Sequence, residues 1–342
     1  MEHQSTTRRH LTESELRSLV RRGFGERTVI TDWRELTGGT YNAAYGVTLG
    51  ESTELVLKVA PSPELKLLSH EVDLMRTEVD FYRRAARVVS VVPEVVYADF
   101  ERDLIGTDFV FLSRIPGTDL GGRRDELTPA QLADVRGEIA AHAARVHTVT
   151  GPAYGYPLRG SRSWQPSWRA AFGAMVDDIL ADAIRLGSAL PATPDRIGDL
   201  MRRHADVLDE VHRPALVHFD LWDGNVFVAD DPAGTVRVTG LIDGERAFFG
   251  DPLAELVSMT LFRDLEDEPE ILAGYASAGH GQLELTASAR RRLTLYTSYL
   301  YLIMCIEGAT RGWEGPERVE YERWLAGLLD AQLGRLDQVR QD

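Results

Sequence analysis

Residues 216–229 constrain the fold more than any other stretch, because a polar cluster stands there between two short apolar runs. The stretch reads Leu-Val-His-Phe-Asp-Leu-Trp-Asp-Gly-Asn-Val-Phe-Val-Ala, with a carboxylate at Asp220 and an amide at Asn225. A second carboxylate, Asp243, follows the β-like run 236–242. Two oxygen ligands and a carboxylate base, delivered from adjacent turns, are what a magnesium–phosphate site requires. The rest of the chain should therefore supply the other half of such a site.

The segment before residue 114 has the pattern of a small sheet with one long helix. Thr12 and Glu15 form a capping box that predicts a short helix to about Arg22. Residues 64–89 have helical periodicity and a charged face. Alternating apolar residues between turn signals predict strands at 29–36, 41–49, 54–60, 95–100 and 107–113. This order indicates a small α+β lobe.

The remainder of the chain is predicted to be mainly helical. Pro116-Gly117 and the loop 119–124 interrupt the pattern, so the chain is expected to divide into an N-terminal lobe, 1–114, and a C-terminal lobe, 115–342. Apart from β-like residues 216–243, periodicity predicts helices at 128–149, 164–187, 194–212, 252–264, 287–311 and 316–339. The expected fold class is α+β, with a small antiparallel sheet lobe, a larger helical lobe and a cleft between them.

Composition narrows the partners. The formal net charge of −15 argues against a general nucleic-acid binder. It would favour cationic small molecules, although a solubilising surface is the commoner reason for such a charge. The single cysteine suits a reducing cytoplasm. The N-terminus has no signal-like apolar core, and the most apolar stretch, 293–309, is shorter than the roughly 20 residues of a bilayer span. We expect a cytoplasmic protein without a membrane segment, and leave its oligomeric state open.

The pair Gly38-Gly39 joins two predicted strands. A glycine turn leaves backbone N–H groups open, so a polyphosphate can approach closely. An ordinary hairpin turn is the commoner use of such a pair. The turn is not a Walker motif, because no Gly-Lys-Ser/Thr occurs in the sequence.

Lys58 lies in a predicted strand that is otherwise apolar on both faces. A buried ammonium group requires an anion, and the functional interpretation places it on the α- and β-phosphates of a nucleotide, steadied by a helix glutamate. Glu78 is preferred to Glu71 for that role, because Phe81 and Tyr82 would anchor its helix to the sheet. An edge-strand lysine that reaches water is the alternative.

Four residues within 218–225 have an expected role. Asp220 would accept or orient the proton of an attacking hydroxyl, and Asn225 would offer its amide oxygen to magnesium. His218 is expected to brace the loop by hydrogen bonding, and Trp222 to pack. Asp243 would bridge magnesium to the β- and γ-phosphates, although a carboxylate at a strand end beside a glycine is also an ordinary turn signal.

Taken together, these features resemble the aminoglycoside phosphotransferase and choline kinase group, which has a protein-kinase-like fold. The order is Gly-Gly turn, strand lysine, helix glutamate, His-x-Asp-(x)4-Asn and Ile-Asp-x-Glu, running from about Leu36 to Leu256. The resemblance implies Asp220 as catalytic base, and Asn225 and Asp243 as Mg²⁺ ligands. It assigns four further residues to the phosphates of ATP or GTP: Gly38, Gly39, Lys58 and Glu78.

The same resemblance implies an interlobe hinge at residues 111–115, with backbone groups of Ser113 and Ile115 facing the adenine. The chain also departs from the group, which often has glycine where Phe219 stands and aspartate where Glu255 stands. The run Asp-Leu-Trp-x-Gly-Asn is similar to fructosamine kinases. These departures do not affect the residues expected for kinase chemistry, but they leave the identity of the acceptor open.

The function we expect is ATP-dependent transfer of the γ-phosphate to a hydroxyl of a small molecule. An antibiotic, aminoglycoside-like or other and including cationic compounds, is the favoured acceptor, because many members of the group inactivate such compounds for resistance or self-protection. The acidic stretch 264–268 would attract a cation or form a solvated loop. The acceptor pocket is expected within 160–190 and 255–310.

Three alternatives stand beside this function. The first is a kinase for a fructosamine, sugar, homoserine or choline-like metabolite. The second is a non-catalytic binding protein with the same fold. The third is a metal-dependent hydrolase, for which the sequence offers no His/Asp ligand cluster.

Overall fold

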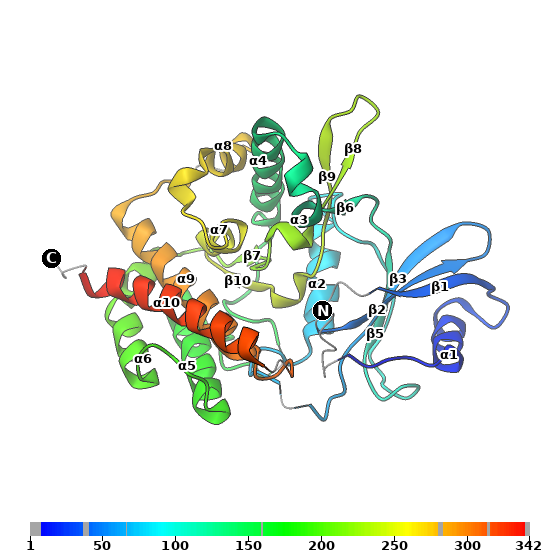
Figure 1. Ribbon diagram of the computed structural model, residues 1–342, viewed down its shortest axis with the longest axis horizontal. Coiled ribbons are helices and arrows are strands. Elements are labelled where there is room, and N and C mark those ends of the chain that lie inside the picture. The colour runs from blue at the N-terminus through cyan, green and yellow to red at the C-terminus, as the bar shows by residue number, and fades with distance from the viewer. Residues whose placement is uncertain are drawn as a thin grey trace.

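A computed structural model describes residues 8–36, 41–65, 67–158, 160–279, 283–312 and 315–338. A small lobe surrounds one antiparallel sheet, and a larger lobe is made mostly of helices (Figure 1). This arrangement confirms the expected α+β class. In the described ranges, none of the helices combines the length and the apolar character that a bilayer span requires.

The small lobe is built on five strands in the order β1-β2-β3-β5-β4, each antiparallel to its neighbours. Their bounds are β1 (Ile30–Leu36), β2 (Ala43–Leu49), β3 (Thr53–Val59), β4 (Val95–Asp99) and β5 (Phe109–Ser113). Lys58 stands opposite Ala44 of β2 and Val110 of β5. It therefore lies on an internal strand, which removes the alternative of an edge lysine.

Helix α1 (Glu13–Phe24) covers one face of this sheet. The predicted capping box is present, because Thr12 and Glu15 exchange side-chain and backbone hydrogen bonds. Leu16, Leu19 and Val20 are buried and share a hydrophobic core with inward-facing strand residues. The apolar stripe of the helix is thus what attaches it to the sheet.

Helix α2 (Leu74–Ala85) is much shorter than the helix predicted over 64–89. It begins after Asp73, whose φ of 52° is left-handed. Upstream of Asp73, side-chain carboxylates accept hydrogen bonds from backbone N–H groups. Leu68 N–H donates to the Glu71 carboxylate at 2.9 Å, and Ser69 N–H donates to Asp182 at 2.6 Å. These hydrogen bonds take the place of the backbone hydrogen bonds that a helix would form here. The periodicity of the sequence gives no sign of them.

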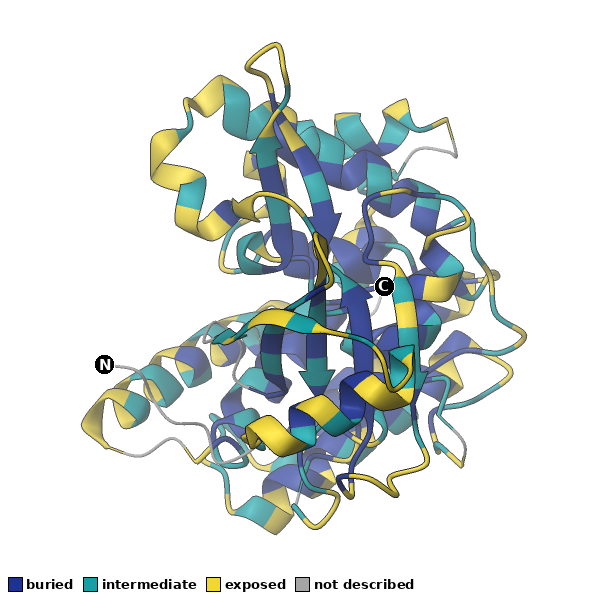
Figure 2. Ribbon diagram, turned by 90° about the vertical axis from the view of Figure 1, so that its right-hand side faces the viewer, coloured by how far each residue is buried: buried dark blue, intermediate teal, exposed yellow. Residues whose placement is uncertain are grey.

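The larger lobe contains eight described α-helices. They are α3 (Leu120–Arg123), α4 (Pro129–Val146), α5 (Trp168–Leu186), α6 (Pro194–Arg203), α7 (Leu253–Met259), α8 (Pro269–Ser277), α9 (Ala287–Glu307) and α10 (Pro316–Gln338). The predicted helix 194–212 is divided, because a 3-10 segment, Ala205–Glu210, follows α6. Helix α8 was not predicted. Buried residues line the inner faces of the elements in both lobes (Figure 2).

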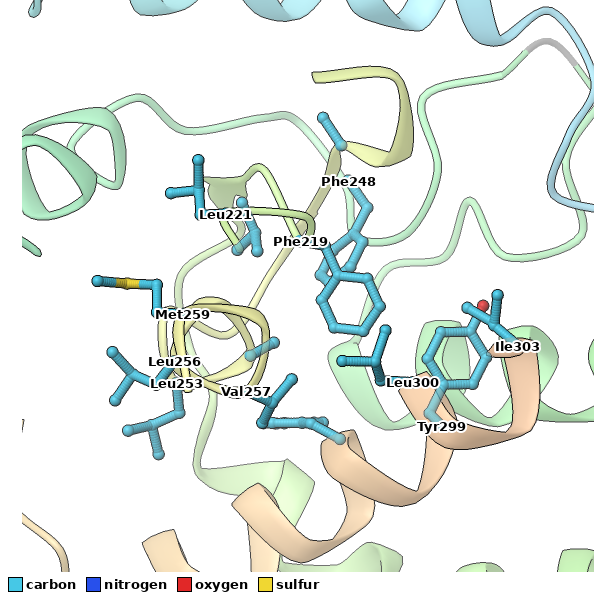
Figure 3. Close-up of a cluster of buried hydrophobic side chains, with 14 of the residues drawn as sticks. Phe219, Leu221, Phe248, Leu253, Leu256, Val257, Met259, Tyr299, Leu300 and Ile303 are labelled. Carbon is cyan, nitrogen blue, oxygen red and sulfur yellow. The ribbon is translucent and has the colours of Figure 1, made fainter. Parts of the chain in front are cut away.

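Short strand pairs carry the polar loops of the larger lobe. β7 (Ala215–Val217) pairs with β10 (Phe248–Gly250), and β6 (Thr118–Asp119), β8 (Val226–Asp230) and β9 (Val236–Leu241) form a second sheet in the order β6-β8-β9. Under the loop after β7 lies an apolar cluster of Phe219, Leu221 and Phe248 with residues of α7 and α9 (Figure 3). The loop is therefore held on a packed base.

Candidate active site

An ion pair joins the sheet to helix α2. Lys58 Nζ lies 2.6 Å from Oε1 of Glu78, and Glu78 is fully buried. Lys58 also contacts the carboxylate of Asp243, which comes from the larger lobe. Burial works to lower the pKa of Lys58, but Asp243 and Glu78 outweigh it and hold the pKa well above its ordinary value. The side chain is therefore an ammonium group between two carboxylates.

Glu71 has a different partner. Its carboxylate pairs with Arg311, just beyond α9, and accepts from the Leu68 backbone. The preference for Glu78 over Glu71 as the partner of Lys58 therefore agrees with the geometry.

Asp243 stands two residues after β9 in a left-handed conformation, φ 61°. Its N–H donates to the Tyr82 hydroxyl at 2.9 Å, and that hydroxyl donates to Glu78 Oε1 at 2.7 Å. A left-handed backbone is uncommon outside glycine, and aspartate is among the residues that tolerate it best. The backbone and Tyr82 together aim the Asp243 carboxylate at Lys58.

Asn225 ends the 3-10 turn Asp223–Asn225, directly before β8. Its Nδ2 donates to the backbone carbonyl of Asp220 at 2.9 Å, which leaves Oδ1 as the ligand atom of the amide. The Ile242 N–H donates to the Asn225 carbonyl at 3.0 Å. Asn225 and Asp243 thus stand at neighbouring ends of two paired strands.

This pair of oxygen donors fits a magnesium ion. Mg²⁺ usually takes one or two protein ligands and completes its shell with water and phosphate oxygens. Within the described residues, no group of three or more His, Cys, Asp or Glu gathers as a metal site. Asn225 Oδ1 and the Asp243 carboxylate are the two donors that such an ion could use here.

Asp220 lies in the loop between β7 and the 3-10 turn, and hydrogen bonds to His218 fix its position. Asp220 N–H donates to His218 Nδ1 at 3.2 Å, so the ring proton is on Nε2, which donates to the Ile242 carbonyl at 2.9 Å. His218 thus braces the loop, as expected from the sequence. Burial raises the pKa of Asp220, while Arg246 works to lower it.

Arg246 is a site residue that we did not predict. It lies 3.8 Å from Asp220 and 2.6 Å from Glu307. The sequence held a signal, because Arg246 is three residues after Asp243 in a buried turn, and a buried guanidinium requires anions. Glu307 gave no such signal, since it comes from the far end of α9.

A further carboxylate, Glu245, also approaches the site. Asn42 Nδ2 donates to Glu245 Oε2 at 2.8 Å. Burial, together with Glu78 and Asp243, raises the pKa of Glu245 despite the opposing charge of Lys58. The wall of the site near β2 is therefore rich in carboxylates.

The remaining residues predicted to bind the nucleotide are Gly38, Gly39, Ser113 and Ile115. Gly38 and Gly39 lie outside the described residues. Ser113 ends β5, and its N–H donates to the Glu94 carbonyl at 2.9 Å, so this backbone donor is already used within the lobe. Ile115 packs against β9, where a Cβ on Gly240 would lie 2.5 Å from Ile115 Cγ2.

The acidic stretch 264–268 is largely paired with arginines. Asp264 faces Arg335 at 4.0 Å, Glu266 pairs with Arg290, and Glu268 lies 2.9 Å from Arg136. Three of its four carboxylates are thus neutralised within the chain. This pairing argues against a site that attracts a cation, but the segment is not a solvated loop either, because Leu265–Asp267 form a 3-10 turn and Glu268 is buried.

Comparison with known proteins gives one family and many structures of the same fold. A family model described as "Phosphotransferase enzyme family" matches residues 32–295. A search of curated proteins finds no match.

Three solved structures illustrate the fold. A protein provisionally assigned as a fructosamine-3-kinase, from Thermobifida fusca YX-ER1, is 20% identical, with TM-score 0.64 over 93% of this chain and 98% of the other. Aminoglycoside phosphotransferase APH(4)-Ia is 17% identical, with TM-score 0.61 over 94% and 99%. The streptomycin–ATP complex of APH(2")-IIa is 15% identical, with TM-score 0.60 over 95% and 99%.

Proposed function

The chain belongs to the phosphotransferase enzyme family, and on that premise we propose that it transfers the γ-phosphate of ATP to a hydroxyl group of a small molecule. The family match and the fold of the solved neighbours confirm the kinase-like group that the motifs indicated. The proposal rests most on one observation: Lys58 of the small lobe contacts both Glu78 and Asp243, beside Asn225 and Asp220.

In this proposal, Lys58 binds the α- and β-phosphates, and Glu78 holds it in place. Asn225 Oδ1 and the Asp243 carboxylate would hold Mg²⁺, which supplies charge neutralisation of the triphosphate. The acceptor hydroxyl gives its proton to Asp220 as its oxygen bonds to the γ-phosphorus. The bond from that phosphorus to the bridging oxygen breaks, and ADP leaves. The chain forms no covalent intermediate, so positioning and electrostatics supply the rate.

The experiment that tests this function measures ATP turnover in the presence of candidate acceptors. Asp220→Ala should abolish transfer while the affinity for ATP stays within about twofold, because the carboxylate acts on the acceptor and not on the nucleotide. Equal turnover by wild type and Asp220→Ala would reject the proposal.

Two acceptor classes remain from the motifs. An antibiotic acceptor, for resistance or self-protection, is supported by the family and by the neighbours named for aminoglycosides. A metabolite acceptor is supported by the neighbour assigned as a fructosamine-3-kinase and by the paired acidic stretch. Protection of growth against an antibiotic panel separates the two, since only the first class predicts it.

A further inference from the structure

Arg311 joins segments that lie far apart in the sequence. It stands in the turn that follows α9, and its side chain is buried. The guanidinium group pairs with the buried carboxylate of Glu71, just before α2. Its Cζ lies 4.7 Å from the centre of the Tyr41 ring, just before β2, and its Nη2 lies 3.9 Å from Oε2 of Glu307. Arg311 therefore links two segments of the small lobe to one helix of the larger lobe.

The contacts on the small-lobe side hold the residue that follows the predicted glycine turn. Tyr41 comes two residues after Gly39 in the sequence. Its hydroxyl donates to the Glu71 backbone carbonyl at 3.2 Å, and its buried ring lies against the guanidinium of Arg311. The position at which the chain leaves the predicted turn and enters β2 therefore depends on Arg311 and Glu71.

The contacts on the larger-lobe side lead to the proposed catalytic base. Oε2 of Glu307, which faces Arg311, also accepts a hydrogen bond from Arg246 at 2.6 Å. Arg246 in turn lies 3.8 Å from the carboxylate of Asp220. One carboxylate oxygen is thus shared by two guanidinium groups. Without Arg311, the charge of Glu307 would act on Arg246 alone and would draw it away from Asp220.

Together these residues form a series of largely buried charges that alternate in sign: Glu71, Arg311, Glu307, Arg246 and Asp220. A buried charge is costly without a partner, so each member constrains the positions of its neighbours. Apolar groups of similar volume often stabilise a fold as well as a buried ion pair does. The series is therefore better explained by the positions that it fixes than by stability alone.

We propose that Arg311 is a positioning residue for both halves of the reaction. Through Tyr41 it sets the end of the turn that would approach the triphosphate. Through Glu307 and Arg246 it sets the position of the Asp220 carboxylate. Arg311 itself contacts neither ATP nor the acceptor. The inference deepens the proposed function and rests on it.

The test compares wild type with Arg311→Gln in two assays. Calorimetry with the non-hydrolysable analogue AMP-PNP and Mg²⁺ gives a nucleotide Kd that requires no acceptor. Transfer from labelled ATP to whichever of kanamycin, D-fructose and D-ribose the wild type phosphorylates fastest gives kcat. The Kd should rise and the kcat should fall, each by about tenfold, within the range for residues that act through a network. An unchanged value in either assay overturns the inference.

Two further variants test the path of the effect. Tyr41→Leu removes the ring that lies against Arg311, so it should raise the Kd for AMP-PNP as Arg311→Gln does. In the double variant the two effects on Kd should not add, because both substitutions break the same contact. Additive effects would overturn the path through Tyr41. Arg311→Lys keeps the charge and loses the planar group, so it should recover kcat more fully than Kd, and equal recovery of both would contradict two separate paths.

Arg292→Gln is the matched control. Arg292 lies near the start of α9 and pairs at 2.8 Å with the buried carboxylate of Asp251. Its loss should lower the melting temperature as Arg311→Gln does, and should change neither Kd nor kcat. Equal kinetic changes in the two variants would show that lost stability is the cause, which overturns the inference. Absence of Asp220-dependent transfer by the wild type to every compound would instead reject the proposed function.

Discussion

Glu255 holds Phe219 in a left-handed backbone conformation. Phe219 has a φ of 66°, and its N–H donates to Glu255 Oε1 at 2.9 Å, while the N–H of His218 donates to Oε2 at 2.7 Å. Two consecutive backbone donors thus converge on one buried carboxylate. The loop that ends at Asp220 depends on this contact for its shape.

Phe219→Gly should destabilise the protein although glycine prefers the left-handed region. Removing the strain gains about 1 kcal/mol, but the ring is buried and packs on Phe248 at 5.0 Å. Loss of a buried aromatic side chain costs about 3–5 kcal/mol. Urea denaturation should therefore give a net loss of about 2–4 kcal/mol. A glycine variant as stable as wild type would mean that strain outweighs packing here.

Glu255→Gln should lower stability in a pH-dependent way. Burial works to raise the pKa of Glu255, but the hydrogen bond and charge of His147, with the hydrogen bond from the His218 backbone, outweigh it, so the folded pKa lies below the unfolded one. A depressed carboxylate pKa stabilises the fold above the unfolded pKa, and this stability is lost as pH falls through the folded pKa. The variant should be about 2–3 kcal/mol less stable at pH 7.

The difference between wild type and Glu255→Gln should shrink as the pH falls below about 4. Denaturation midpoints of both proteins between pH 3 and 8 measure it. An offset that stays constant over that range would show that Glu255 acts through shape and not through its charge.

Arg246→Gln should move the acid limb of the pH profile of kcat/KM to higher pH. Asp220 must be ionised to take a proton, and Arg246 opposes the rise in its pKa that burial causes. Loss of Arg246 raises that pKa further. Glu307 also acts to raise the pKa of Asp220, so Glu307→Gln should move the limb the other way. Two variants that shift the limb in the same direction would contradict this assignment.

Lys58→Met should reduce kcat/KM for ATP by about 10²–10³, the scale of losing one preorganised charge at a reacting phosphate. It leaves Glu78 buried without its cation, so a thermal melt should accompany the kinetics. Arg34→Met removes an exposed cation of β1 and serves as the matched control, with little change expected. A wild-type rate in Lys58→Met would exclude Lys58 from the phosphate site.

Asn225→Ala should raise the Mg²⁺ concentration for half-maximal turnover about tenfold, the effect of weakening one ligand position. Excess EDTA should abolish turnover in both proteins, and added Mg²⁺ should restore it. A magnesium titration at saturating ATP is the measurement. Overlapping titration curves for the two proteins would remove Asn225 from the metal site.

The fold was predictable from the sequence where local patterns agree with tertiary packing. The capping box at Thr12 and the five strands of the small lobe lie within one or two residues of their predicted bounds. The helix predicted over 64–89 was wrong at both ends, and its start failed because Asp182, far along the chain, binds the backbone of Ser69. Contacts between residues that are far apart in the chain do not produce a periodic pattern in the sequence.

The site was predictable where its residues lie in short sequence motifs. Lys58, Glu78 and Asp243 were named from the sequence, and the structure brings them together. Arg246 and Glu307 were not named, although Arg246 contacts both Asp220 and Glu307 in the folded chain. Glu307 comes from the far end of α9, and no motif connects it to the other site residues.

Helix α2 is fastened to the larger lobe at its middle. Phe81 packs edge-on against His218 at 4.9 Å and fills the space over Gly244, and the Tyr82 hydroxyl accepts from Asp243 N–H. An outward movement of this helix, and of Glu78 with it, would break its contacts with His218 and Asp243. By these contacts α2 belongs with the larger lobe as much as with the sheet, and Lys58, which pairs with both Glu78 and Asp243, is where the sheet meets that combined unit.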